Sequence, residues 1–235
     1  MKSPSSVFLA LFSFASLQAD AQAAEMTVFQ SNMRSKATNQ FYQEEYKRIG
    51  AYKVKGSSLL LKGHNVTDLY STLGYGTNLP IIYDCYTQKL SILQENGTDV
   101  VQLTNEEVDS FKVKVDKDIN NTVPMFFINA EKTDGSKKMF LQQLTNEKRY
   151  NLYKHYIADM KPAAMDVAQT NVMEFKIVEE YYFADKTSKG SFVKIKPNGR
   201  SLQEQFKDNK EALKTLDSSL PFENKLLLFF DQVNN

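Results

Sequence analysis

The feature that most limits the fold of this chain is an alternation of apolar and polar side chains, which begins near Tyr52. Residues 90–95 and 98–103 are the clearest such runs, and the pair Asn96-Gly97 joins them. A two-residue type I′ turn needs positive φ at both positions, and Asn-Gly supplies this most readily. The sequence therefore predicts a β-hairpin centred on this pair.

More strands are predicted around this hairpin. Phe111 begins a run in which apolar residues alternate with Lys112 and Lys114, which is typical of a strand with one wet face. A second hairpin is predicted around Asp134-Gly135. The predicted strands are residues 111–116, 123–129, 138–144, 149–157, 172–183 and 191–196. Residues 63–78 show no clear period.

The connections between these runs are too short for crossover helices, so the strands should pair antiparallel. We therefore predict an α+β fold made mainly of antiparallel β-sheet, with a C-terminal helical segment. A meander, a sandwich and a partly open barrel all fit the pattern.

The C-terminal part changes to a helical period. Ser201 and Asp208 are each followed three residues later by Glu, which predicts two short helices with N-terminal caps. Pro221 suits the first turn of a third helix. An apolar stripe follows at helical spacing, consisting of Phe222, Leu226, Phe229, Phe230 and Val233. We expect it to pack on the chain's own sheet, with docking to a partner as the alternative.

The first 24 residues resemble a cleaved signal peptide. Lys2 precedes an apolar stretch, residues 7–17, and Ala21-Gln22-Ala23-Ala24 offers the small side chains that signal peptidase accepts. The stretch is shorter than the roughly 20 residues that a membrane helix needs. We thus expect an exported protein with no transmembrane anchor after cleavage, located in the periplasm, in the cell envelope or outside the cell.

Four segments follow from these patterns. They are a signal peptide (1–24), an N-terminal leader (25–50), an antiparallel β domain (51–198) and C-terminal helices packed on it (199–235). Within the leader, residues 39–48 could form a helix.

The charge balance argues against nucleic acid as a partner. Twenty-nine Lys and Arg face 28 Asp and Glu, for a net charge of +1, and the two signs are interspersed. Binding to a polyanion normally needs a clustered excess of cations. The single cysteine, Cys85, cannot form an intramolecular disulfide, and we expect it to be buried and unreactive.

No familiar catalytic pattern occurs in the sequence. The only histidines, His64 and His155, belong to no metal-binding spacing, and no G-x-S-x-G elbow is present. The adjacent carboxylates of Glu106-Glu107 and of Glu179-Glu180 would point to opposite faces of a strand, so neither pair can act as a unit. We expect no catalytic residues, no metal and no cofactor.

Aromatic residues are abundant, with 12 Tyr and 16 Phe. Tyrosine combines apolar area with a polar tip, which suits binding surfaces. The candidate binding residues are Tyr150, Tyr153, Tyr156, Tyr181 and Tyr182. The alternative is that these rings pack inside the β-core.

Three stretches together resemble a family of uncharacterised exported proteins of Gram-negative bacteria. They are Gly56-Ser57-Ser58-Leu59-Leu60-Leu61, the stretch Leu79-Pro80-Ile81-Ile82-Tyr83-Asp84-Cys85-Tyr86-Thr87-Gln88-Lys89-Leu90, and the helical tail over residues 200–235. Residues 62–78 differ from the short glycine turn of that family. The resemblance implies a periplasmic or envelope location and transfers no functional residue.

Taken together, these observations favour a non-catalytic envelope protein that binds another protein or a surface polymer. The alternative is a hydrolase that acts on glycans with carboxylates brought together by the fold.

Overall fold

The computed structural model describes residues 53–61, 65–93, 100–118, 121–135, 137–162, 172–188 and 191–235. The predicted signal peptide, the leader with its possible helix, and His64 lie outside these residues. No helix within the described ranges has the length and apolar character needed to cross a bilayer.

A large open sheet dominates the fold. Its eleven strands in the described ranges are β1 (Lys53–Lys55), β2 (Asn65–Ser71), β3 (Gly74–Asp84), β4 (Lys89–Leu93), β5 (Val100–Leu103), β6 (Val108–Asp118), β7 (Asn121–Asn129), β8 (Phe140–Gln143), β9 (Tyr150–Pro162), β10 (Val172–Asp185) and β11 (Val193–Ile195). Their order is β1-β10-β9-β8-β7-β6-β2-β3-β4-β5, and β11 pairs with β10 beside this path. This confirms the predicted α+β class with a mainly antiparallel sheet.

One pairing differs from that expectation. β1 pairs with β10 in parallel, with Val54 opposite Met173. β1 is followed directly by Gly56, whose φ is +80° and whose added Cβ would lie 2.9 Å from the Phe175 carbonyl oxygen. Glycine is therefore required where the chain leaves this edge of the sheet.

The first predicted hairpin is confirmed by its pairing. β4 and β5 are antiparallel, with Leu90 opposite Leu103 and Leu93 opposite Val100. This is the register that a two-residue connection at Asn96-Gly97 requires. The connection itself lies outside the described residues.

The region without a clear period contains a strand pair that the sequence did not reveal. β2 and the first half of β3 are antiparallel, and the register shifts between Thr67 and Leu69. Such a β-bulge puts two residues of one strand opposite one of the other. The shift interrupts the alternation of apolar and polar residues by which strands are recognised, so residues 63–78 gave no sign of a strand pair.

The second hairpin has a different connection from the one predicted. β7 and β8 do pair, with Ile128 opposite Leu141. Between them the chain forms a short helix, α2 (Ala130–Asp134), rather than a tight turn at Asp134-Gly135. Gly135 instead ends this helix with a φ of +72°, as a left-handed C-terminal residue does.

The C-terminal helices are α3 (Arg200–Gln205), α4 (Lys210–Lys214) and α5 (Phe222–Asn234), with single 3₁₀ turns η1 (Lys186–Ser188) and η2 (Thr215–Asp217). The predicted caps are wrong. α3 begins after Gly199, so Ser201 lies inside it, and α4 begins after Asn209 rather than Asp208. Neither helix start has a side-chain cap bond, although the helices lie where they were predicted.

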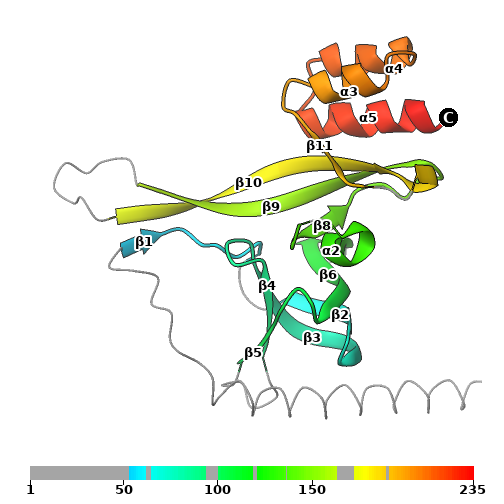
Figure 1. Cartoon of the computed structure of the whole chain (residues 1–235). Coiled ribbons are helices and arrows are strands. Elements are labelled where there is room, and N and C mark those ends of the chain that lie inside the picture. Colours follow the sequence, from blue (N-terminus) through cyan, green and yellow to red (C-terminus); the bar gives the residue numbers. More distant parts are fainter. Residues whose placement is uncertain are drawn as a thin grey trace, which may run out of the picture.

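The helices lie against one face of the long β9–β10 hairpin, whereas β2 to β8 curl away on the other side (Figure 1). Leu226, Phe229 and Phe230 of α5 are buried, in a cluster with Leu152 and Phe183 of the hairpin. The predicted stripe therefore packs on the chain's own sheet, as expected.

A second core fills the curled part of the sheet. Phe111 and Phe127 stack with ring centroids 4.6 Å apart, and Tyr83 meets both rings edge-on. These residues come from β6, β7 and β3, so aromatic packing holds the curved strands together.

Candidate polar pocket at one end of the sheet

A pocket of about 270 Å³ lies where two turns meet at one end of the sheet, and its surface consists mostly of the apolar atoms of polar residues. Because Leu90 is opposite Leu103, the turn before β4 and the turn after β5 come together there. The lining residues are Thr87, Gln88, Lys89, Thr104, Asn105, Glu106 and Lys138. They offer hydroxyl, amide, carboxylate and ammonium groups, which suits hydrogen bonding to a polar ligand.

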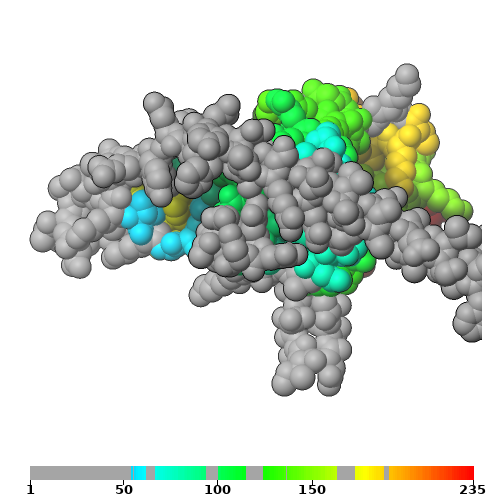
Figure 2. All heavy atoms as spheres, turned by 90° about the horizontal axis from the view of Figure 1, so that it is seen from below, coloured from blue at the N-terminus to red at the C-terminus, as the bar shows by residue number. Residues whose placement is uncertain are grey.

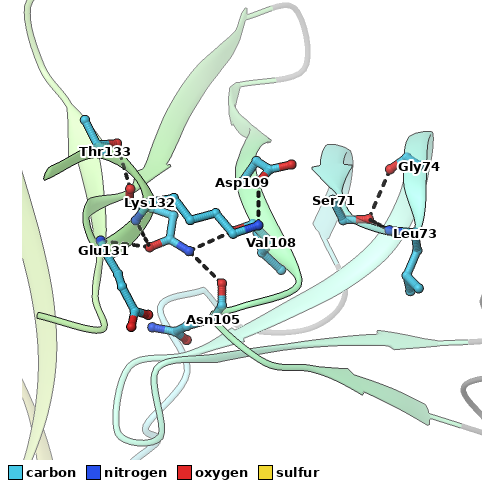
Figure 3. A network of polar contacts seen from close by, with 10 residues as sticks. Ser71, Leu73, Gly74, Asn105, Val108, Asp109, Glu131, Lys132 and Thr133 are labelled. Atoms are coloured by element: carbon cyan, nitrogen blue, oxygen red, sulfur yellow. Dashed lines mark hydrogen bonds and ion pairs between the residues drawn. The ribbon is translucent and has the colours of Figure 1, made fainter. Parts of the chain in front are cut away.

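The backbone around this pocket is fixed by Asn129, at the end of β7. Its Nδ2 donates to the carbonyl oxygens of Asn105 (2.6 Å) and Val108 (2.8 Å), and its Oδ1 accepts from the Glu131 amide N–H (3.0 Å) (Figure 3). Asn129 is thus the N-cap of α2 and also joins this helix to the turn after β5. With 1% of its surface exposed, it has no contact with bulk water to replace these bonds.

Two polar atoms beside this network lack a hydrogen-bond partner among the described residues. They are Nδ2 of Asn105 and Oε2 of Glu131, and both atoms are buried. In Figure 3 the Glu131 carboxylate and the Asn105 amide point toward one another. A buried donor and a buried acceptor left unpaired each cost about 1–3 kcal/mol, so this polar network is incompletely satisfied among the described residues.

One ion pair belongs to the pocket lining, and a second lies beside the Asn129 network. Lys138 pairs with Glu106 at 2.7 Å, and Lys132 pairs with Asp109 at 2.5 Å. The ammonium of Lys138 lowers the pKa of the Glu106 carboxyl through a hydrogen bond and its charge. Both members of the Lys138–Glu106 pair are largely exposed, so this pair stays charged at the mouth of the pocket and contributes little to stability.

Gln88 lines the pocket and connects it to β9. Its Nε2 donates to the carbonyl oxygens of Cys85 (2.8 Å) and Tyr156 (2.9 Å), and its Oε1 accepts from the Tyr83 hydroxyl (2.7 Å). The same oxygen lies 3.0 Å from Nε2 of His155. Gln88 has a φ of +56°, an unusual conformation for a residue other than glycine. Tertiary hydrogen bonds therefore hold this turn in a strained backbone form.

His155 and Cys85 are close to this network but are not arranged for catalysis. Burial lowers the pKa of His155 to about 4, and its Nδ1 has no partner among the described residues. Burial, followed by the charge of Asp84, raises the pKa of the Cys85 thiol to about 12. The thiol is therefore protonated near neutral pH and only 1% exposed, as expected for an unreactive cysteine.

The five predicted tyrosines are spread over two faces of the β9–β10 hairpin. Four of them, Tyr153, Tyr156, Tyr181 and Tyr182, are at least nine-tenths buried, and Tyr150 is half-buried. Their rings belong to three separate clusters. A binding role for them stays a prediction, and in this structure their rings pack in the interior.

Carboxylates from distant positions do come together on one of these faces. The Tyr181 hydroxyl lies 2.9 Å from both Glu179 and Glu223 and can donate its one proton to either, and the buried Lys154 ammonium forms ion pairs with both carboxylates. The space between the two carboxylates is filled by this hydroxyl and this ammonium. The cluster therefore fixes the start of α5 to the hairpin and leaves no place there for a substrate.

The other predicted carboxylate pairs behave differently. Glu179 and Glu180 do point to opposite faces, since Glu180 pairs with Lys194 instead. Glu106 and Glu107 lie in a turn rather than a strand, so the alternation argument was wrong for them. In the ranges that the structure covers, no group of three or more His, Cys, Asp or Glu side chains could hold a metal ion.

The pocket residues gave little signal in the sequence. Asn105 and Glu131 are 26 positions apart, and Asn129 at the end of β7 joins their backbones through its side chain. In the view from below, atoms from the middle of the chain, coloured green, form a lobe beside the yellow atoms of β10 (Figure 2).

Comparisons with protein-family models, with curated proteins and with solved structures give no match for this chain.

Proposed function

We propose that this chain is a non-catalytic exported protein that binds a polar unit of another protein or of a surface polymer in the pocket at the end of its sheet. The single observation that carries the proposal is that residues with polar side chains line this pocket, among them the buried Asn105, whose Nδ2 has no hydrogen-bond partner among the described residues. Asn105 is 7% exposed, so a ligand group that reaches it would be shielded from competing water.

The chemistry around the pocket supports binding rather than turnover. The neighbouring thiol is protonated and buried, and the one histidine nearby is neutral and already hydrogen-bonded to Gln88. An activated nucleophile needs a base within hydrogen-bond reach, and Cys85 and His155 are connected only through the Gln88 amide.

Export is part of the proposal and rests on the sequence. The cation at Lys2, the apolar residues 7–17 and the small residues before position 25 together favour a cleaved signal peptide. Expression of the full chain in a Gram-negative host, followed by mass spectrometry of the periplasmic fraction, tests this. A mature N-terminus near Glu25 is the expected result, and an uncleaved cytoplasmic chain would contradict it.

Binding can be tested with the purified protein and two envelope polymers. We would incubate the full chain with peptidoglycan sacculi and with lipopolysaccharide and measure the bound fraction by sedimentation. Asn105→Leu and Lys138→Ala should each reduce the bound fraction severalfold. Lys214→Ala is the matched control, because Lys214 forms a comparably exposed ion pair with Glu211 on the far helices.

Two results would refute this proposal. The first is a bound fraction that the pocket variants leave unchanged. The second is the release of soluble sugar fragments by the wild-type protein, which would favour the alternative of a carboxylate-dependent glycan hydrolase.

A further inference from the structure

The turn between β3 and β4 is held against the long hairpin by a contact to a buried histidine. We call this turn, residues 85–88, the hairpin tip. Its last residue, Gln88, places its Oε1 3.0 Å from Nε2 of His155 on β9. The Ala158 amide N–H of the same strand donates to the Cys85 carbonyl oxygen of the tip at 3.2 Å. Both contacts must break if the tip moves away from β9.

The His155 ring carries a single proton in this arrangement. The Gln88 amide is oriented by its Nε2, which donates to the carbonyl oxygens of Cys85 and Tyr156, so its Oε1 can only accept. Nε2 of the ring is therefore the donor, and Nδ1 is buried without a hydrogen-bond partner among the described residues. A second proton would go to Nδ1 and would create a buried donor without an acceptor, on a residue that is 7% exposed.

The charged groups around the ring compensate this second proton poorly. Glu180 of β10 is opposite His155 in the register, but its carboxylate already accepts from the Tyr182 hydroxyl at 2.9 Å and from the Lys194 ammonium of β11 at 2.5 Å. Burial lowers the pKa of His155 to about 4; the Glu180 charge raises this pKa, and the ammoniums of Lys194 and Lys137 lower it. The ring is thus neutral near neutral pH.

The titratable groups on the side of the tip add no charge that faces Nδ1. Burial raises the pKa of both the Tyr83 hydroxyl and the Cys85 thiol, so both are uncharged near neutral pH. The Asp84 carboxylate, directly before the tip, accepts from the amide N–H groups of Tyr86 and Thr87. It therefore binds the backbone of the tip itself.

Release of the tip would remove this obstacle to protonation. β9 is fixed on both sides at His155, because Leu141 of β8 and Glu180 of β10 are opposite it. The tip is less firmly held, since Thr87 is exposed and Gln88 has a strained φ of +56°. Once the tip moves away, water reaches the ring and its pKa returns toward 6.5. The released form therefore binds a proton that the closed form does not between pH 6.5 and about 4.

We propose that the contact between Gln88 and His155 is a pH-sensitive switch, which releases the hairpin tip from β9 when His155 takes up a second proton. This inference goes beyond the proposed function and does not depend on it. Thr87, Gln88 and Lys89 also line the pocket, so release of the tip would change the shape of the pocket in acid.

Hydrogen exchange of the Ala158 amide reports the release, because its hydrogen bond joins β9 to the tip. We would follow exchange by NMR on the ¹⁵N-labelled full chain and divide each rate by that of an unstructured peptide at the same pH. The ratio of released to closed tip should rise about 30-fold from pH 7.5 to pH 5, so we expect the protection of this amide to fall at least tenfold.

Urea distinguishes release of the tip from unfolding of the whole chain. Local opening exposes little surface, so low urea concentrations should leave the exchange rate of the Ala158 amide unchanged. Amides that exchange only by global unfolding become faster with urea, because global unfolding exposes the core.

A matched pair of variants assigns the effect to one histidine. His155→Gln removes the titrating group and keeps a donor for the Gln88 side-chain oxygen, so the protection of the Ala158 amide should be the same at both pH values. His155→Asn gives the same test with a shorter side chain. His64→Gln removes the other histidine of the chain and should keep the pH dependence of the wild type. Far-UV circular dichroism confirms that each variant is folded.

Three results would overturn the inference. The first is protection of the Ala158 amide that does not change between pH 7.5 and pH 5. The second is an Ala158 exchange rate that rises with urea as steeply as the rates of core amides, since the tip then opens only with the whole protein. The third is a pH dependence that persists in the His155→Gln variant. None of these results bears on binding at the pocket, which the sedimentation assay tests separately.

Discussion

Gln88 and His155 lie 67 positions apart in the chain, yet the Gln88 side-chain oxygen is 3.0 Å from Nε2 of the imidazole. The Gln88 Nε2 donates to two carbonyl oxygens, which fixes the orientation of its amide and turns the oxygen toward the ring. Nε2 of His155 therefore carries the proton, and Nδ1 is the unprotonated nitrogen. This contact joins the turn before β4 to the long hairpin.

Replacing Gln88 should destabilise the protein. Gln88→Ala leaves the Tyr83 hydroxyl and the carbonyl oxygens of Cys85 and Tyr156 without their partner, which we expect to lower the free energy of unfolding by about 2–4 kcal/mol. Gln88→Gly should cost about 0.5–1 kcal/mol less than Gln88→Ala, because glycine adopts a φ of +56° without strain. Urea unfolding measures both values. Equal stability of the alanine variant and the wild type would show that these hydrogen bonds do not contribute to the free energy of unfolding.

His155 should make stability depend on pH in the acidic range. Burial lowers its pKa from 6.5 to about 4 in the folded state. The unfolded chain binds a proton that the folded chain does not between these two pH values, so stability is complete above pH 6.5 and falls as the pH drops to about 4. The total loss from this group is about 3 kcal/mol.

The variant His155→Phe isolates that effect, because all other titrating groups are shared with the wild type. The difference in unfolding free energy between the two proteins should shift in favour of the variant as the pH falls from 7 to 4. A difference that stays constant over this range would mean that His155 keeps an ordinary pKa.

Lys154 and Glu223 should contribute to the free energy of unfolding as a coupled pair. The Lys154 side chain is 8% exposed, so Glu223→Gln leaves a buried ammonium with only Glu179 for charge compensation. We expect this variant to lose about 2 kcal/mol, and Lys154→Met with Glu223→Gln to lose less than the sum of the single changes. A double-mutant cycle by urea unfolding gives the coupling. Strict additivity would rule out a direct interaction between the two side chains.

The helical segment should be part of the cooperative fold. Phe230 of α5 is completely buried against the β9–β10 hairpin. Phe230→Ala should therefore lower the free energy of unfolding by about 3–5 kcal/mol. Leu228 lies on the same helix with 44% of its surface exposed, and Leu228→Ala should change the unfolding free energy by about 0.5 kcal/mol or less. Thermal unfolding followed by circular dichroism distinguishes the two. Similar melting temperatures of the Phe230→Ala and Leu228→Ala variants would contradict the packing of Phe230 against the hairpin.

The sequence alone was sufficient where a signal is local. Alternation identified most of the strands and Asn96-Gly97 predicted the observed β4–β5 register, because side-chain period and turn geometry depend on neighbouring residues. The stripe on α5 was recognised for the same reason. The helix caps failed, since a cap depends on where the chain enters the helix, and packing placed that entry at Gly199 and Asn209.

Other features were decided only by the tertiary structure. The β2–β3 pair was not predicted because a bulge interrupts its alternation, and four of the five candidate tyrosines proved to be buried. The pocket arises where the turn before β4 meets the turn after β5, and the buried amide of Asn129 joins the second of these turns to α2. No local pattern encodes such a link, because it joins residues that are distant in the sequence and are brought together only by the folded sheet.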